Sequence, residues 1–485
     1  MSAELDALAP ARVWRYFLEL SAIPRPSGQE ERAAAWLVAE ARALGLDVER
    51  DSVGNVLIRK PASPGCEGAP TVAMQAHIDM VCEKNEDTVH DFANDPIRVR
   101  RDGEVLRATG TTLGADDGIG VAAGLAALAD PSLVHPALEL LVTMDEETGL
   151  TGANGLATGW LRAKILLNLD SEAEGQVTIG CAGGVDTVAT RAITWEPVPE
   201  GSVPVRVKVF GAKGGHSGAD ICQGRANAIK VLAQVLGGLP TTLQWRLAAF
   251  DGGNKRNAIA REAVAMLAVP AEHVPALRER VAELATGWRA AFGRFDPHLS
   301  VVVEEGHATR VASEADGRAL VDLLLALPHG VEARSPDIAD LVQTSTNLGV
   351  LHTAEGFEVN LLTRSAIEAS KVALVERIEA ACRLAGFATE RVGDYPGWKP
   401  EPGAAVVGVI DRAWQELAGK PVEVIAIHAG LECGLIGEKY PGMEMASFGP
   451  DVWDAHTPEE RVSIPSVAKF WTLLVNVLHR LALPT

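Results

Sequence analysis

Three consecutive acidic residues follow an apolar run in the first half of the chain. The run, residues 138–144, ends in Asp145, Glu146 and Glu147. Carboxylates this close repel one another in a buried site unless cations neutralise them. With a metal ion present, the two glutamates would have different roles: one of Glu146 and Glu147 would bind the ion, and the other would accept a proton from water. The alternative is a solvated acidic turn.

His77 and Asp79 stand two residues apart after another apolar run, residues 71–75. Because side chains alternate along a strand, both would point to the same face. A histidine there suits a metal ligand, and Asp79 would hold its imidazole in one tautomer. The HxD pattern is frequent by itself, so it gains weight only beside other candidate ligands.

The segment GADDG places Asp116 and Asp117 where a glycine-containing loop enters an alanine-rich stretch typical of a helix. One carboxylate can bridge two divalent cations through its two oxygens, which suits a loop aspartate. Helix capping by either aspartate is the simplest alternative. A dinucleotide fingerprint in Gly118, Gly120 and Ala123 is disfavoured, because the loop does not directly follow an apolar strand.

Two further candidate ligands follow apolar runs. Asp170 ends the run 165–169, and His456 comes after the run MEMASF, within DVWDAHTPEERV. Carboxylate oxygens and imidazole nitrogens bind zinc, manganese and cobalt alike. A lone loop histidine carries little information, so the interpretation of His456 depends on the other candidates.

Four apolar runs would have to position these side chains: residues 71–75, 138–144, 165–169 and 422–427. Nearly continuous hydrophobicity is typical of strands buried on both faces, as in the parallel sheet of an α/β domain. The runs end in HID, DEE, DSE and HAGLE, respectively. Because ligands bind outside the carboxyl ends of strands in open α/β sheets, we expect the four endings to meet.

The chain is long enough for two domains, and the first is expected to be discontinuous. Residues 1–187 and 397–485 indicate an α/β catalytic domain with a mostly parallel sheet, and residues 188–396 indicate an inserted α+β lid domain. Segments rich in proline and glycine mark both borders. A repeated strand-and-helix pattern near 205–237 and 356–386 predicts two βαβ-like halves in the insert.

Acidic residues outnumber basic ones by 64 to 44, which gives a formal net charge of -20. Such a chain repels phosphate backbones and anionic lipids, so neither nucleic acid nor a membrane is an expected partner. The N-terminal segment lacks the features of a secretory signal, and a cytoplasmic location is expected. The six cysteines form no CxxC pair, which argues against a structural zinc cage or a disulfide framework.

Ordered motifs along nearly the whole chain resemble those of the M20 metallopeptidases. They are HID, GADDG, DEETG, LDSE, GGHSGADI, GGNKRNAI, LTRS, IHAGLECG and AHTPEERVSI. Within that family the resemblance points to the branch of aminoacyl-histidine dipeptidases, because the long insert resembles the doubled insert of that branch.

The resemblance implies a zinc-peptidase catalytic domain that binds two zinc ions, with manganese or cobalt as substitutes. The implied ligands are His77, Asp116, Glu147, Asp170 and His456. Asp116 would bridge the ions. His77 and Asp170 would complete one site, and Glu147 and His456 the other.

The same resemblance implies that Glu146 is the general base and that Asp79 orients His77. Peptide bonds after the bridging aspartate are often cis in this family. The bond between Asp116 and Asp117 is therefore expected to be cis.

From the insert, the resemblance implies that His216 in GGHSG stabilises the tetrahedral oxyanion. The implied substrate-binding residues are Asn257, Arg364 and Gly430. Arg364 suits a terminal carboxylate, because its planar guanidinium donates two parallel hydrogen bonds. His428 and Glu432, which flank Gly430 in HAGLE, receive no firm role.

The resulting hypothesis is metal-dependent hydrolysis of dipeptides, including Xaa-His substrates such as β-alanyl-histidine. The expected partner is the dipeptide, and a homodimer is left open. One alternative is an M20-type N-acyl amino acid deacylase, such as the acetylornithine or succinyl-diaminopimelate enzymes. The other is a catalytically inactive homologue that serves as a binding protein.

Overall fold

The computed structural model describes residue 5 and residues 7–483, and the chain divides into two compact units. The first unit holds the described residues up to Gly180, Pro400–Ala426, and the described residues from Leu431 onward. The second unit holds Cys181–Lys399 and Ile427–Gly430. The chain enters the second unit a few residues earlier than the sequence indicated, because β9 pairs with β20 from its first residue.

The first unit is built on an eight-stranded sheet. In spatial order its strands are β1 (Asp47–Arg50), β2 (Val56–Lys60), β6 (Leu138–Thr143), β3 (Val72–His77), β7 (Ile165–Asn168), β23 (Glu444–Ser447), β8 (Gln176–Cys181) and β22 (Glu423–Ile427). The central strands β6, β3, β7 and β23 run parallel. Every residue of β3 and β6 is buried, which explains why their sequences are mostly apolar.

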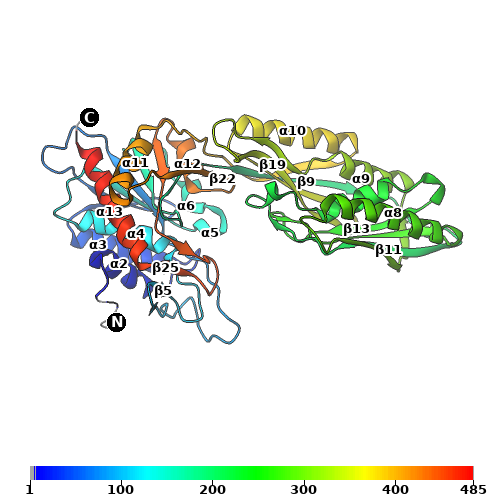
Figure 1. Cartoon of the computed structure of the whole chain (residues 1–485), viewed down its shortest axis with the longest axis horizontal. Helices are drawn as coiled ribbons and strands as arrows, with labels where there is room; N and C mark the ends of the chain where they lie inside the picture. The colour runs from blue at the N-terminus through cyan, green and yellow to red at the C-terminus, as the bar shows by residue number, and fades with distance from the viewer. Residues whose placement is uncertain (1–4, 6, 484–485) are drawn as a thin grey trace. The chain divides into compact units, whose positions relative to one another are not determined.

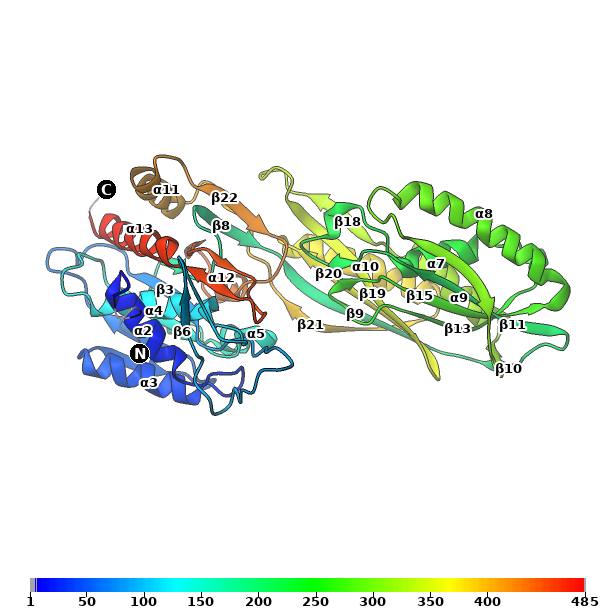
Figure 2. The ribbon, with the colours of Figure 1, turned by 60° about the horizontal axis from the view of Figure 1, so that its bottom comes forward.

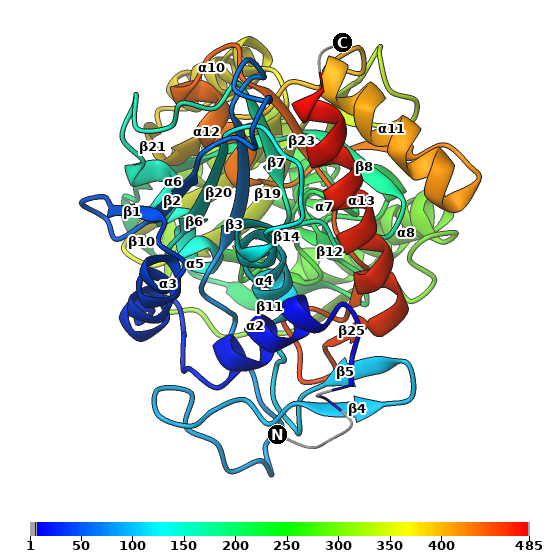
Figure 3. The same ribbon diagram turned by 90° about the vertical axis from the view of Figure 1, so that its left-hand side faces the viewer.

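Helices cover this sheet, and Figure 3 views the unit with α2, α4 and α13 toward the reader. The helices are α2 (Ala11–Ser21), α3 (Glu31–Ala43), α4 (Ala115–Ala129), α5 (Glu146–Gly149), α6 (Thr151–Gly155), α11 (Ala405–Ala418), α12 (Glu432–Lys439) and α13 (Ile464–Ala482). Small residues let α4 approach the sheet closely, since a Cβ at Gly124 would lie 2.5 Å from Leu140 of β6. In the described part of the chain, no helix combines the length and the apolar character that crossing a membrane requires.

A four-stranded sheet in the first unit carries the loop that contains His456. Its strands, in spatial order, are β24 (Val452–Trp453), β25 (Arg461–Ser463), β5 (Val105–Arg107) and β4 (Arg100–Asp102). The loop joins β24 to β25, whose antiparallel pairing brings Val452 opposite Val462. Both ends of the loop are therefore anchored.

The second unit contains a larger sheet with helices along one side of it (Figures 1 and 2). Its strands are, in spatial order, β16 (Ser300–Glu305), β11 (Ser202–Phe210), β15 (Ala263–Pro270), β13 (Arg246–Gly252), β19 (Val342–Thr353), β20 (Gly356–Ser365), β9 (Gly183–Ala192) and β21 (Ala388–Tyr395), with β18 (Gly330–Arg334) beside β19. The helices are α7 (Ala228–Gly237), α8 (Val274–Phe292), α9 (Glu314–Ala326) and α10 (Glu368–Leu384). Two small ribbons pair β10 (Trp195–Pro197) with β17 (Arg310–Ala312) and β12 (Gly215–His216) with β14 (Ala258–Ile259).

The second unit contains the two predicted βαβ-like halves. Strands β11 and β13 both run antiparallel to β15 between them, so they are parallel to each other and joined through α7. In the same way β20 and β21 both run antiparallel to β9 and are joined through α10. The α/β fold with a mostly parallel sheet and the α+β character of the insert, both expected from the sequence, are confirmed.

Candidate active site

Three of the four predicted strand endings lie at one edge of the first sheet. The parallel register places His77 opposite Thr143 and Gln75 opposite Asn168. The residues that follow β3, β6 and β7 consequently leave the sheet side by side. We call the cluster they help to form the acidic centre; its members are His77, Asp116, Glu146, Glu147, Asp170 and His456.

The fourth ending behaves differently from the expectation. Strand β22 lies at the edge of the sheet, beyond β8, and His428 in the following segment belongs to the second unit. The chain returns to the first unit at Leu431, and the next residue is Glu432. Its buried carboxylate accepts hydrogen bonds from Gln75 Nε2 at 2.5 Å and Thr143 Oγ1 at 2.7 Å. The endings of β3, β6 and β7 therefore lie together as expected, whereas β22 ends at the edge of the sheet.

Asp116 lies between the two imidazoles of the acidic centre. Its Oδ1 is 3.1 Å from His77 Nε2, and its Oδ2 is 3.1 Å from His456 Nε2. The peptide bond between Asp116 and Asp117 is cis, as the resemblance implied. One carboxylate thus contacts two histidines that are far apart in the sequence.

The remaining acids divide between these histidines. Asp170 Oδ1 lies 3.6 Å from His77 Nε2, and Glu147 Oε1 lies 3.1 Å from His456 Nε2. The candidate ligand atoms of His77, Asp116 and Asp170 all lie within 4.8 Å of one another, and the same holds for Asp116, Glu147 and His456. These are two candidate cation groups that share Asp116.

The donor set fits divalent cations. Glu147 Oε1 is buried, and His456 Nε2 lies 3.1 Å from it, so an oxygen and a nitrogen of the kinds that bind divalent cations face each other. Hydrogen bonds to Asp116 and Glu147 raise the pKa of His456 to about 11. A site that holds a proton so firmly between carboxylates is one where a cation could replace that proton.

Asp79 connects His77 to the loop that carries the two glutamates. Its Oδ1 lies 3.3 Å from His77 Nδ1, and its carboxylate accepts hydrogen bonds from the backbone N–H groups of Glu146 and Glu147 at 3.0 and 3.2 Å. Burial alone would raise its pKa, but His77 and the other hydrogen-bond donors outweigh burial and lower the pKa of Asp79 to about 2. Asp79 is therefore an anion that lies beside Nδ1 of the ring, while Nε2 of the ring faces Asp116 and Asp170.

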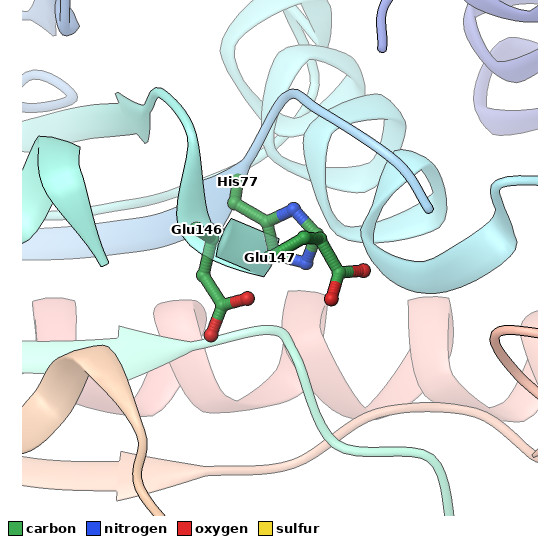
Figure 4. A group of neighbouring side chains, drawn as sticks. All are labelled: His77, Glu146 and Glu147. Atoms are coloured by element: carbon green, nitrogen blue, oxygen red, sulfur yellow. The ribbon is translucent and has the colours of Figure 1, made fainter. Parts of the chain in front are cut away.

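Glu146 and Glu147 leave adjacent backbone positions in different directions. Figure 4 shows the Glu147 carboxylate near the ring nitrogens of His77 and the Glu146 carboxylate directed to another side. Burial, together with the negative charges of Glu432 and Glu147, raises the pKa of Glu146 to about 8. A carboxylate destabilised in this way is a good proton acceptor near neutral pH.

The Asp117 carboxylate contacts the backbone of helix α4, whereas the Asp116 carboxylate faces the two imidazoles. Its Oδ1 accepts a hydrogen bond from Gly120 N at 3.1 Å, as a residue that caps a helix does. Burial raises the pKa of Asp117 well above its usual value. Of the two alternatives for the aspartate pair, capping thus describes Asp117, and a shared carboxylate describes Asp116.

Sequence reasoning missed two buried charges that contact the loops of the acidic centre, Arg25 and Glu460. Arg25 donates hydrogen bonds to backbone oxygens after β3, and Glu460 accepts them from the backbone before Asp116. Glu460 stands four residues after His456, so the segment AHTPEER offered a signal for it. Nothing in IPRPSG marks Arg25.

The second unit holds His216 on the short strand β12. Its Nδ1 accepts hydrogen bonds from the backbone N–H groups of Gly218 and Ala219 at 3.2 and 3.1 Å. An accepting Nδ1 leaves the proton of a neutral ring on Nε2. Burial, and then the positive charge of Arg364, lowers the pKa of His216, so the ring is a neutral Nε2–H donor.

Arg364 is buried on β20, and its Nη1 donates a hydrogen bond to the hydroxyl of Tyr395 at 2.9 Å. Its Nε has no hydrogen-bond partner among the described residues. The ring of Tyr395 covers Gly430, where a Cβ would lie 3.0 Å from Tyr395 Cε2. Tyr395, which the sequence analysis did not identify, therefore lies against two of the implied substrate-binding residues.

Two other residues complete this part of the second unit. His428 Nε2 shares a hydrogen bond of 2.7 Å with Ser345 Oγ, and burial followed by the charge of Arg364 lowers the pKa of His428 to about 3. Asn257 is exposed, and its backbone oxygen accepts a hydrogen bond from Ser217 N at 2.9 Å. We call His216, Ser345, Arg364, Tyr395 and His428 the arginine cluster.

An α/β sheet with imidazoles and carboxylates gathered at its strand ends is the arrangement expected of a metal-dependent hydrolase. Comparison with known proteins defines the family. The chain belongs to peptidase family M20/M25/M40, whose model matches residues 73–480.

Two relatives match almost the whole chain. The cytosol non-specific dipeptidase of Escherichia coli (strain K12) is 43% identical over 481 residues, which are 99% of this chain and 99% of that protein. The crystal structure of an aminoacylhistidine dipeptidase from Vibrio alginolyticus superimposes with a TM-score of 0.93 at 42% identity, covering 99% of this chain and 98% of that one. The aminopeptidase PepT from Bacillus cereus ATCC 10987 shares the fold, with a TM-score of 0.58 at 17% identity over 98% of this chain and 100% of that one.

Proposed function

We propose that this protein is a dipeptidase that uses two divalent cations, zinc in the first place, with manganese or cobalt as substitutes. The observation that carries the proposal is the position of Asp116, whose two oxygens each lie 3.1 Å from a different imidazole. Such a shared carboxylate suits two neighbouring cations better than one. The likeness to two dipeptidases over nearly their whole length supports the substrate class.

Five side chains would hold the cations, in the two groups described above. His77, Asp116 and Asp170 would hold one, and Asp116, Glu147 and His456 the other. When bound, such a pair would supply Lewis-acid chemistry and lower the pKa of a water molecule. The excess of carboxylates over imidazoles in the acidic centre favours positively charged occupants.

Glu146 is the proposed general base. Its raised pKa of about 8 suits it to take a proton from the attacking water and to deliver it to the leaving amine. Asp79 supports both groups, because it contacts His77 through Oδ1 and receives the N–H groups of Glu146 and Glu147. The peptide bond is cleaved when the amine leaves with that proton.

The arginine cluster is proposed to act on the substrate. His216 presents an Nε2–H donor suited to the oxyanion that develops on the scissile carbonyl. Arg364, whose Nη1 is held by Tyr395, suits the terminal carboxylate of a dipeptide. Asn257 and Gly430 are the further proposed substrate contacts.

Xaa-His dipeptides, including β-alanyl-histidine, are proposed as substrates. Release of histidine from β-alanyl-histidine, compared with release of acetate from acetylornithine, tests this against the deacylase alternative. We expect hydrolysis of the dipeptide, its loss after treatment with a chelator, and its return when Zn²⁺, Mn²⁺ or Co²⁺ is added. Faster acetate release would assign the protein to the deacylases, and no turnover of either compound by metal-loaded protein would favour a binding homologue.

We also infer that the protein acts in the cytoplasm. The inference rests on the name of the Escherichia coli relative, a cytosol non-specific dipeptidase. Fractionation of cells that express the chain checks it, and recovery outside the cytoplasm would contradict it.

A further inference from the structure

The segment that leads into Asp116 is held by one side chain. Glu460 is 2% exposed, and each of its carboxylate oxygens receives two backbone N–H groups. Oε2 accepts from Leu113 at 2.7 Å and Gly114 at 3.0 Å, and Oε1 accepts from Ala115 at 2.7 Å and Asp116 at 3.3 Å. Four consecutive N–H groups therefore converge on a single carboxylate.

Arg25 holds the same segment from its carbonyl side. It is 1% exposed, and its guanidinium donates to Ile78 O at 2.7 Å, Asp79 O at 2.8 Å and Gly114 O at 2.5 Å. Arg25 thereby ties the chain after His77 to the chain before Asp116. A Cβ at Gly114 would lie 2.4 Å from Arg25 Nη2, and Gly114 has a φ of +70°, so glycine is required there.

Two buried charges of this kind are a poor means of adding stability. Taking a charged side chain out of water costs free energy, and replacing buried charges by apolar residues is often neutral or stabilising. Their hydrogen bonds go instead to backbone groups at or beside His77, Asp79 and Asp116. The contacts thus point to a role in placing those side chains.

We propose that Glu460 and Arg25 are positioning residues that hold Asp116 between the two cation groups, so that both groups are formed before any cation arrives. This inference rests on the proposed two-cation function. Neither side chain binds a cation. Both act through the backbone of the segment that Asp116 ends.

Substitution of Glu460 by glutamine tests this role. Each oxygen receives two N–H groups, so the amide NH₂ of Glu460→Gln faces two donors in either orientation of the side chain. Calorimetric titration of cation-free protein with Zn²⁺ alone gives the number of ions bound and the affinity of each binding step. We expect the weaker step to lose about 10- to 100-fold in affinity, the usual effect of removing an outer partner of a ligand.

Glu139→Gln is the matched control. Glu139 is 1% exposed in the same unit, and its Oε2 accepts hydrogen bonds from the backbone N–H groups of Arg162 and Ala163 at 2.9 and 3.0 Å. The Glu139 carboxylate accepts these bonds from residues that precede β7, away from the segments that contain His77 and Asp116. If Glu139→Gln weakens Zn²⁺ binding as much as Glu460→Gln does, or if Glu460→Gln binds like the wild type, the positioning role is wrong.

Arg25→Lys provides a second route in case Glu460→Gln does not fold. Lysine keeps the charge but loses the fork that reaches three carbonyl groups, so we expect the same weakening in the second Zn²⁺ step. Unchanged binding by a folded Arg25→Lys protein would overturn the proposal. Wild-type protein that takes up fewer than two ions would instead overturn the proposed function, and this inference with it.

Discussion

In the first unit, His456 lies between the carboxylates of Asp116 and Glu147, which raise its pKa to about 11. In the second unit, burial and Arg364 lower the pKa of His428 to about 3. The same side chain is driven toward its charged form in one place and its neutral form in the other. The acidic centre is therefore suited to bind cations, and the arginine cluster is suited to bind anionic groups with neutral donors beside a fixed positive charge.

The comparison predicts that changes in the two clusters affect different measurements. Loss of a carboxylate or imidazole ligand from the acidic centre should alter cation binding, whereas changes in the arginine cluster should leave it intact. Substrate affinity and stabilisation of the transition state should depend on the arginine cluster.

The largest effect is expected for Glu146→Gln. Removal of the proposed base should lower kcat for β-alanyl-histidine by about 10²- to 10⁴-fold, the usual contribution of general acid–base catalysis. Metal content, measured by mass spectrometry, should stay that of the wild type. Asp145→Asn is the control, because the Asp145 carboxylate accepts hydrogen bonds from Thr148 and Thr151, which the amide oxygen of asparagine can still accept, and turnover should change little. Normal turnover by Glu146→Gln would remove Glu146 from the mechanism.

His216→Ala is expected to act on the chemical step from the second unit. Loss of one donor to a developing oxyanion typically lowers kcat by about 10²- to 10³-fold. KM and metal content should change little. His352→Ala serves as the control, since His352 is an exposed histidine of the same unit that pairs with Asp251 at 3.0 Å. Equal losses in the two variants would show that the effect is not specific to His216.

Arg364→Lys should act mainly on substrate binding. Lysine keeps the charge but not the planar fork, so KM for dipeptides should rise about 10-fold or more, the worth of one charge-assisted hydrogen bond. Arg391→Lys on the adjacent region of the sheet is the control, because Arg391 pairs with Glu379 at the surface. Steady-state kinetics distinguish the two, and an unchanged KM in Arg364→Lys would end its proposed role.

The smallest effect is expected outside both clusters, at Asp316. Burial would raise its pKa, but hydrogen bonds from Arg191, Thr194 N and Ser313 outweigh burial and lower it from 3.8 to about 2. A carboxylate with a lowered folded-state pKa stabilises the fold above its unfolded-state pKa, and this stabilisation is lost as the pH falls through the folded value. Above its unfolded-state pKa, the Asp316 carboxylate contributes about 2 kcal/mol to the free energy of unfolding.

Asp316→Asn should therefore lower the free energy of unfolding by about 2 kcal/mol at pH 6, and the difference from wild type should shrink between about pH 4 and pH 2. Urea denaturation at several pH values measures it, and metal content at neutral pH should not change. A difference that is independent of pH would show that charge is not the cause.

The fold followed from the sequence where one physical rule decided the outcome. Nearly continuous apolar runs identified β3, β6 and β7, because strands covered on both faces are apolar at most positions. The repeated pattern identified both βαβ-like halves. The path after β22 was not predictable in this way, because HAGLE resembles the other endings although β22 lies at the edge of the sheet.

The candidate site was predictable to the extent that it uses residues with recognisable chemistry. Residue types narrowed the candidates, the family resemblance singled out His77, Asp116, Glu147, Asp170 and His456, and the structure gathers them. Arg25, Glu460, Tyr395 and Glu432 were missed as supporting residues. Their contacts are long-range hydrogen bonds to backbone or side chains, which leave no periodic trace in a sequence.

The division of the first unit by the insert also orders events during synthesis. His77, Asp116 and Asp170 all precede the second unit, so a growing chain contains one complete cation group early. The other group waits for His456, which is made only after the whole insert. A ribosome must therefore finish nearly all of the chain before Asp116 has its second histidine, and a shortened product has one half of the centre at most.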